Sequence, residues 1–212
     1  YKLADGMPIT SDRHRNAGQT TPVIENGVIY QGNRPRFSGR HGYPGMHGLS
    51  AAAFKLPSDS NSTNIVPQPF IEVAQVAGGI SYHISAPLLV GDALYTIDMA
   101  GYFAVYDMKE GKELYHCYPD WHNRCSRMLY GVAASPTLAG NYIYLVNGAG
   151  ETLVLKSGPK YEVVARNVLE DINRYEPVNN PCDQDMFLTA PVFEGNTMYL
   201  RGRQYFYCIE GK

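Results

Sequence analysis

The chain has 212 residues, and its 18 Lys and Arg against 20 Asp and Glu give a formal net charge of −2. A nearly neutral chain lacks the basic charge of nucleic-acid and anionic-membrane binders, so we expect no nucleic-acid partner. Hydrophobic residues make up 44% and charged residues 18%, a balance that excludes intrinsic disorder. No apolar run reaches the roughly 18 to 20 residues that cross a bilayer, so we expect no membrane span.

The distribution of Gly and Pro favours strands over helices. The chain holds 21 Gly and 14 Pro, and the longest segment free of both is residues 160–176. Such spacing leaves little room for ordinary helices. The 17 Tyr suit half-buried strand surfaces. The sequence therefore predicts an all-β chain.

A ten-residue pattern recurs four times and organises the chain. In each copy a Pro precedes a Tyr by eight positions, and a dipeptide of Gly with Asn or Asp lies between them. These dipeptides accept the positive φ angles of two-residue hairpin turns, so each copy predicts strand, tight turn and strand. The pairs are Pro22 and Tyr30, Pro87 and Tyr95, Pro136 and Tyr144, and Pro191 and Tyr199.

A long insertion over residues 31–69 follows the first copy. Its first part, residues 31–48, has Gly at every third position from 39 to 48, which we interpret as an irregular loop. Arginines there and upstream suggest a positive patch for an anionic ligand or an acidic partner, or a loop whose arginines bond its own carbonyls. The candidate patch residues are Arg13, Arg15, Arg34, Arg36 and Arg40.

The second and third copies extend into further strands. Residues 95–106 align without a gap on residues 144–155, with Gly101 and Gly150 at the same place. An Asp-x-x-x-Gly-Lys turn at residues 107–112 then leads into a fourth strand. Four antiparallel strands per copy predict a β-propeller blade. Blades therefore start near residues 20, 85, 134 and 189, in a single partial β-propeller domain over residues 1–212.

The densest polar cluster lies in a second loop insertion, residues 116–128. The spacings Cys-x7-Cys and His-x5-His match no established zinc motif. Three hypotheses stay open: a Cys117–Cys125 disulfide that closes a short loop, two unlinked thiols, or a metal site. The metal candidates are His116, Asp120 and His122.

The fourth copy is expected to end after its third strand, in which Cys208 should be buried as a small apolar residue. Its outer strand must then come from elsewhere, and residues 1–5 could supply it only if the chain closes on itself as a four-bladed ring. The chain also begins at Tyr1 and shows no signal-peptide pattern, which indicates a processed product or a fragment. We therefore expect companion blades, from the same gene product or from another chain.

Three features of the copies are the Ser/Ala-Pro start, the Gly-x-x-x-Tyr second strand and the Asp-x-x-x-Gly-Lys turn at residues 107–112. With these features the chain resembles the quinoprotein-like repeats of quinoprotein alcohol dehydrogenases and of the propeller lipoprotein of the bacterial outer-membrane assembly machinery. Residues 149–162 and 199–209 look most like uncharacterised planctomycete-type bacterial propellers. The resemblance implies a seven- or eight-bladed ring and a periplasmic or otherwise extracytoplasmic location. The chain departs from the family at Tyr115, where a Trp is usual.

The sequence predicts a binding protein rather than an enzyme. It has no Gly-x-Ser-x-Gly elbow, phosphate-binding loop or His-Glu-x-x-His motif, and no adjacent Cys pair of the kind the resembled dehydrogenases place over their quinone. We expect no cofactor, and a non-enzymatic scaffold or binding module that mediates protein–protein interaction in a larger assembly. The alternatives are part of a quinoprotein (PQQ-type) oxidoreductase, or a metal-carrying accessory subunit.

Overall fold

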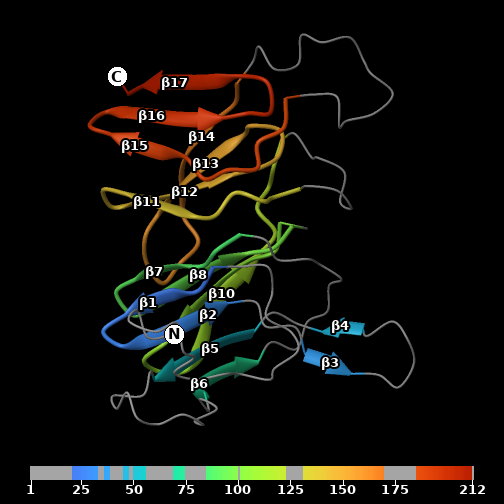
Figure 1. The fold of residues 1–212 in the computed structure, drawn as a ribbon, viewed down its shortest axis with the longest axis vertical. Helices are drawn as coiled ribbons and strands as arrows, with labels where there is room; N and C mark the ends of the chain where they lie inside the picture. The colour runs from blue at the N-terminus through green and yellow to red at the C-terminus, as the bar shows by residue number, and fades with distance from the viewer. Residues whose placement is uncertain are drawn as a thin grey trace, which may run out of the picture.

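The computed structural model describes residues 21–32, 36–38, 45–47, 50–55, 69–74, 85–99, 101–122, 131–169 and 185–211. These residues form strands and no helix, as the sequence predicts. Figure 1 shows four antiparallel sheets stacked in chain order, with the first and the fourth at opposite ends. In this part of the chain, nothing helical has the length and apolarity to cross a membrane.

Each sheet corresponds to one copy of the repeat. Sheet one comprises β1 (Val23–Glu25), β2 (Val28–Gly32), β5 (Ser50–Lys55) and β6 (Pro69–Ala74). Sheet two comprises β7 (Leu88–Val90), β8 (Ala93–Ile97), β9 (Phe103–Asp107) and β10 (Lys112–Cys117). Sheet three comprises β11 (Thr137–Ala139), β12 (Tyr142–Val146), β13 (Thr152–Lys156) and β14 (Val163–Asn167). Sheet four comprises β15 (Val192–Glu194), β16 (Thr197–Arg201) and β17 (Phe206–Glu210).

The first turn of each copy has the predicted hairpin geometry. Between β1 and β2, Asn26 and Gly27 have φ angles of 49° and 74°, the pair of positive values that a type I′ turn requires. In the other three copies only the first central residue, a Gly, has a positive φ, as in a type II′ turn. Its φ is 59° at Gly91, 59° at Gly140 and 57° at Gly195.

A second turn joins the two central strands of sheets two and three. The Asp98 carboxylate accepts a hydrogen bond from the Tyr102 backbone N–H at 2.7 Å. At the same place in sheet three, the Asn147 side-chain oxygen accepts one from the Glu151 N–H at 3.0 Å. The gap-free alignment of these two copies therefore corresponds to one shared turn, fixed by a side chain at its first position.

Side chains alternate between the two faces of each sheet and so build the core between sheets. In sheet two, alternate residues of β8 and β9 contact sheet one, and the others contact sheet three. We call the face that carries the repeat's Tyr the forward face, because Tyr95 packs toward sheet three. The opposite side is the backward face. The apolar side chains of sheet two that are 0% exposed are Leu94, Ala104 and Tyr106 on its backward face, and Ile97, Phe103 and Val105 on its forward face.

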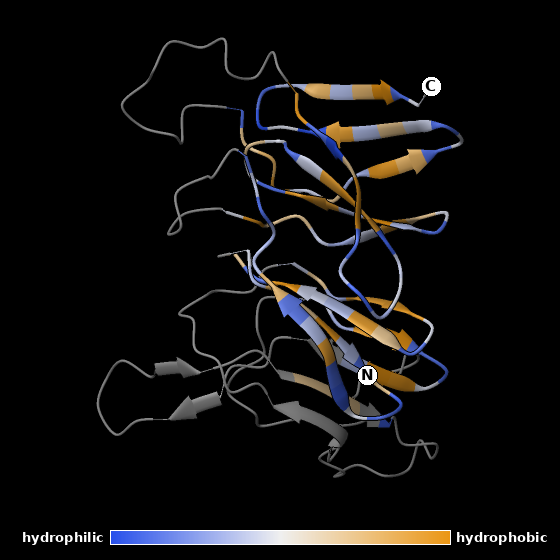
Figure 2. Ribbon diagram, turned by 180° about the vertical axis from the view of Figure 1, so that it is seen from behind, coloured by the Kyte–Doolittle hydropathy of each residue, from blue (hydrophilic) through white to orange (hydrophobic). Residues whose placement is uncertain are grey.

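The same packing continues from sheet three to sheet four. Tyr144 on the forward face of sheet three lies against Phe193, with ring centroids 4.6 Å apart. Val146 and Leu200 share a buried cluster at this junction. Figure 2 shows hydrophobic residues, in orange, on the strands along the stack, including the strands of sheet four at its end. Sheets packed face to face in sequence order are the arrangement of propeller blades.

The insertion at residues 31–69 is more structured than the sequence predicts. It contains β5, the third strand of sheet one, and a separate hairpin of β3 (Arg36–Ser38) and β4 (Gly45–His47). The interpretation of residues 31–48 as an irregular loop is therefore wrong where these strands lie. The apolar residues Phe37 and Met46 are register partners in this hairpin. The regular spacing of Gly in this segment favoured a loop and gave no sign of such a cross-strand pair.

Candidate functional site

The end of β10 and the segment that follows it lie at the junction between sheets two and three, and they hold the candidates His116, Cys117, Asp120 and His122. On β10, the His116 ring stacks on Tyr102, with centroids 5.2 Å apart, and its Nδ1 lies 2.5 Å from Glu113 Oε1. Tyr118 meets Tyr102 edge-on at 5.1 Å and is 59% exposed. Burial raises the pKa of the Tyr102 hydroxyl, so this group stays neutral. The three rings form an aromatic patch at the rim of sheet two.

Cys117 turns to the other side of β10 and packs against the core between sheets two and three. Burial raises the pKa of its thiol to about 11, so it is protonated at neutral pH. A protonated thiol is a poor nucleophile and a poor metal ligand. Cys125 lies outside the described residues, so the Cys117–Cys125 disulfide stays a prediction.

Trp121 closes the top of the same junction. Its backbone N–H donates to the Pro119 carbonyl at 3.0 Å, a tight turn that directs the indole onto the core between the two sheets. A Cβ on Gly101 would lie 3.4 Å from the indole nitrogen. Gly101 also has a φ of 83°. The 3.4 Å distance is ordinary van der Waals contact, so a glycine is favoured here by the positive φ of the turn and not by the indole.

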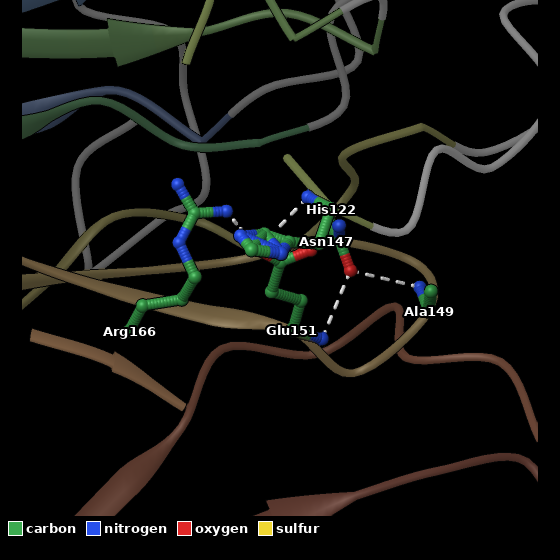
Figure 3. Close-up of polar contacts among 5 residues, drawn as sticks. All are labelled: His122, Asn147, Ala149, Glu151 and Arg166. Carbon is green, nitrogen blue, oxygen red and sulfur yellow. Dashed lines mark hydrogen bonds and ion pairs between the residues drawn. The ribbon is translucent and has the colours of Figure 1, made fainter. Parts of the chain in front are cut away.

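A buried carboxylate ties this segment to sheet three (Figure 3). Glu151, directly before β13, is 0% exposed, and its Oε1 accepts hydrogen bonds from Arg166 Nη1 at 2.5 Å and from the His122 backbone N–H at 3.1 Å. Arg166 comes from β14, opposite Leu153 in the ladder. Asn147 Oδ1 accepts hydrogen bonds from the backbone N–H groups of Ala149 and Glu151, at 3.0 Å each. These bonds hold the turn from which the Glu151 side chain extends.

The structure does not gather the predicted metal candidates into one site. His116 is engaged with Tyr102 and Glu113, His122 contributes its backbone N–H to Glu151, and Asp120 is exposed. Across the residues the structure describes, no group of three or more His, Cys, Asp and Glu is placed to hold a metal ion.

The predicted arginine patch remains a prediction. Arg13, Arg15, Arg34 and Arg40 lie outside the described residues, and Arg36 is described only as part of β3.

Cys208 is exposed, and the expectation that it would be buried is wrong. It lies on β17 opposite Tyr199, which places it on the forward face of sheet four. This is the last sheet of the stack, and no described sheet covers that face. The error came from assigning burial by residue type, although a strand at the end of a stack has one open face.

The Glu151 and Arg166 pair was not predicted from the sequence. One signal was available, since Glu151 stands where the aligned copy has the buried Tyr102. A charge at a buried repeat position implies a partner of opposite charge.

Three stacked four-stranded sheets and the three-stranded sheet four, with their hairpin turns and the core between them, define a β-propeller fold. Solved structures with the same fold include two quinohemoprotein alcohol dehydrogenases. The enzyme from Comamonas testosteroni aligns with a TM-score of 0.56 and 13% identity, over 88% of this chain and 29% of that one. Enzyme ADHIIG from Pseudomonas putida HK5 aligns with a TM-score of 0.55 and 11% identity, over 90% of this chain and 32% of that one.

The computationally designed Ika4 protein has a TM-score of 0.55 and 11% identity, over 97% of this chain and 98% of that one. No protein-family model matches the chain, and no curated protein matches it. The chain spans about a third of the two dehydrogenases. At these identities the similarity establishes the β-propeller fold that the sequence predicts. The resemblance to quinoprotein repeats and the planctomycete-type resemblance stay predictions.

Proposed function

We propose that this chain is a non-enzymatic β-propeller scaffold or binding module that mediates protein–protein interaction in a larger assembly. The observation that carries the proposal is the forward face of sheet four. Val192 is 64% exposed and Phe206 is 67% exposed there, and Cys208 lies exposed on the same face. Single exposed apolar residues are ordinary, whereas several on one sheet face are typical of an interaction surface.

The contacts of the buried polar residues in the turns and between the sheets indicate a structural role for these residues. Glu151 is paired with Arg166, and Asp98 and Asn147 accept backbone N–H groups in turns. Asp185, before β15, accepts hydrogen bonds from the Gln204 N–H at 2.6 Å and from a tyrosine hydroxyl at 2.8 Å. These buried side chains stabilise loops, and none of these contacts gives a nucleophile beside a general base.

The competing hypothesis is part of a quinoprotein oxidoreductase, and its support is the shared fold of the two dehydrogenases. The residues of this chain do not fit the quinone, because no two cysteines are adjacent and Trp121 packs at a junction between sheets. We expect the chain to bind no pyrroloquinoline quinone at micromolar concentration and to show no dye-linked dehydrogenase activity. Quinone binding measured by fluorescence or calorimetry would favour the oxidoreductase.

A metal-carrying accessory subunit is the third hypothesis, and it rests on residues 116–125. We also propose the periplasmic or otherwise extracytoplasmic location that the resemblance implies. Fractionation of cells that express the full gene product tests this location, and recovery of the protein in the cytoplasmic fraction would contradict it.

Site-directed photo-cross-linking tests the binding function. A photoreactive residue at position 206 of the full chain, expressed in its source organism, should give protein adducts that peptide mass spectrometry can identify. The matched control is position 160, where the exposed Lys160 lies between β13 and β14. If position 206 gives no more adduct than position 160, the forward face of sheet four binds no protein and the proposal fails.

A further inference from the structure

The forward face of sheet four repeats a surface that is buried inside the stack. In sheet two, Leu88, Tyr95 and Val105 are opposite one another across three strands and pack toward sheet three. The equivalent row in sheet four is Val192, Tyr199 and Cys208. Phe103 pairs with Ile97 and is fully buried, whereas its equivalent Phe206 pairs with Arg201 and is 67% exposed.

The backward face of sheet one repeats the complementary surface. In sheet two, Leu89 and Leu94 are register partners on the face that packs against sheet one, and Leu94 is fully buried. Their equivalents in sheet one are Ile24 and Ile29, which are also register partners. Ile24 is 60% exposed. Among the residues that the structure describes, no sheet therefore covers the backward face of sheet one or the forward face of sheet four, and we call these the two open faces.

We propose that the forward face of sheet four binds the backward face of sheet one in a second copy of this chain. This inference rests on the proposed function and names the partner. Each internal junction joins one forward face to one backward face, so the chain carries both halves of the same interface. The new contact would continue the arrangement already present between sheets one and two, and between sheets two and three.

Two such contacts close a ring. Sheets one and four lie at opposite ends of the stack, so each copy offers its two open faces to the two ends of the other (Figure 1). Four sheets from each copy give a two-fold ring of eight sheets, within the range of about four to eight blades that propellers use. Two-fold dimers are the most frequent oligomers, and closure of a head-to-tail contact prevents filament growth.

The test is the oligomeric state of the full chain. Native mass spectrometry and sedimentation of the unmodified chain should give twice the 23.5 kDa of one copy. Phe206→Asp and Ile24→Lys should each raise the dimer dissociation constant about 30-fold or more, as expected when an interface anchor becomes charged. Val164→Asp is the matched control, since Val164 is exposed on the outer strand of sheet three, away from both open faces. It should leave the dimer intact.

Mixing the two variants provides a second readout. A ring that contains one Phe206→Asp copy and one Ile24→Lys copy has one unaltered interface and one that brings opposite charges together, so the mixture should regain dimer mass. Alkylation of Cys208, followed by peptide mass spectrometry, should slow on dimerisation, because this residue lies within the proposed contact. Circular dichroism of each variant verifies that the sheets are intact.

Three results would overturn the inference: a monomer at tens of micromolar, a dimer that Phe206→Asp leaves unchanged, or open-ended higher oligomers. The cross-linking experiment separates this failure from failure of the proposed function. Adducts from position 206 to a different protein would overturn the second copy as partner and leave the binding function standing. The absence of any adduct, together with a monomer, would overturn both.

Discussion

Glu151 is a fully buried charged residue at the junction between sheets two and three. A carboxylate that is 0% exposed has lost its hydration, and the Arg166 guanidinium and the His122 N–H replace it. Such a pair adds little net stability over an apolar pair, but loss of one partner leaves an uncompensated buried charge. Its value here is positional, because it attaches the segment after β10 to β14.

Arg166→Met should lower the free energy of unfolding by about 3 kcal/mol, because it removes the guanidinium that is paired with the buried Glu151 carboxylate. Chemical denaturation measures the change. The double variant Glu151→Gln with Arg166→Met should recover part of the loss. Lys160→Met, at an exposed position between β13 and β14, is the control and should change stability by no more than about 0.5 kcal/mol. Equal effects of Arg166→Met and Lys160→Met would show that the pair is dispensable.

The Cys117 thiol should be alkylated slowly in the folded chain, and its deprotonation should lower the free energy of unfolding at alkaline pH. Its pKa is about 11 in the folded chain against an ordinary value of 9.0, so the folded state holds more protons than the unfolded state between pH 9 and 11. The free energy of unfolding should therefore decrease as pH rises through this window. At pH 8, after reduction, alkylation of Cys117 should be about 100-fold slower than in urea. An inflection of the rate near pH 9 in the folded chain would contradict the burial.

At the scale of elements, the hairpin turns depend on backbone conformation rather than on contacts. Gly140, between β11 and β12, has a φ of 59°, and a Cβ there would meet nothing within 4 Å. The free-energy cost of adding a side chain at Gly140 therefore comes from the strain of an L-residue at a positive φ, and not from a clash. The same reasoning applies at the first central residue of the turns in sheets two and four.

Gly140→Ala should reduce the free energy of unfolding by about 1 to 2 kcal/mol, since an L-residue is strained at this φ. Asn141→Ala changes the neighbouring turn residue, whose φ is not positive, and should cost no more than about 0.5 kcal/mol. Thermal and urea unfolding of both variants give the comparison. A Gly140→Ala chain as stable as the parent would mean that the turn can change type without cost.

The outer strands share a further feature that only the structure shows. In sheets one, two and three, the ladder between the last two strands shifts register at the same repeat position, opposite Ala53, Val105 and Val154 respectively. A bulge increases local twist. A bulge at the same repeat position in these three sheets indicates that their outer strands are twisted in the same way.

At the scale of the whole molecule, stability resides in the junctions between neighbouring sheets. The largest cluster lies between sheets two and three, and Leu145 is fully buried in it. Because each junction contacts only adjacent sheets, local stability should resemble a sum over neighbours, as in repeat proteins.

Leu145→Ala should cost about 2 to 5 kcal/mol, because it leaves a cavity in this junction. Leu138→Ala, at an exposed position of β11, should cost far less. Hydrogen exchange of the Leu145→Ala chain should accelerate most in sheets two and three and least in sheet four. Uniform acceleration across all sheets would indicate that the stack unfolds as a single unit.

The repeat, the hairpin turns and the all-β blades could be predicted from the sequence. These features depend on neighbours within about ten residues: Gly with Asn or Asp sets the turn, and alternating apolar residues set the two-faced strands. Tertiary structure alone decided the pairing of Glu151 with Arg166, the packing of Trp121 at a junction and the exposure of Cys208. Each of these depends on which sheet, if any, lies against a face, and burial is a property of that neighbour rather than of the strand that carries the residue.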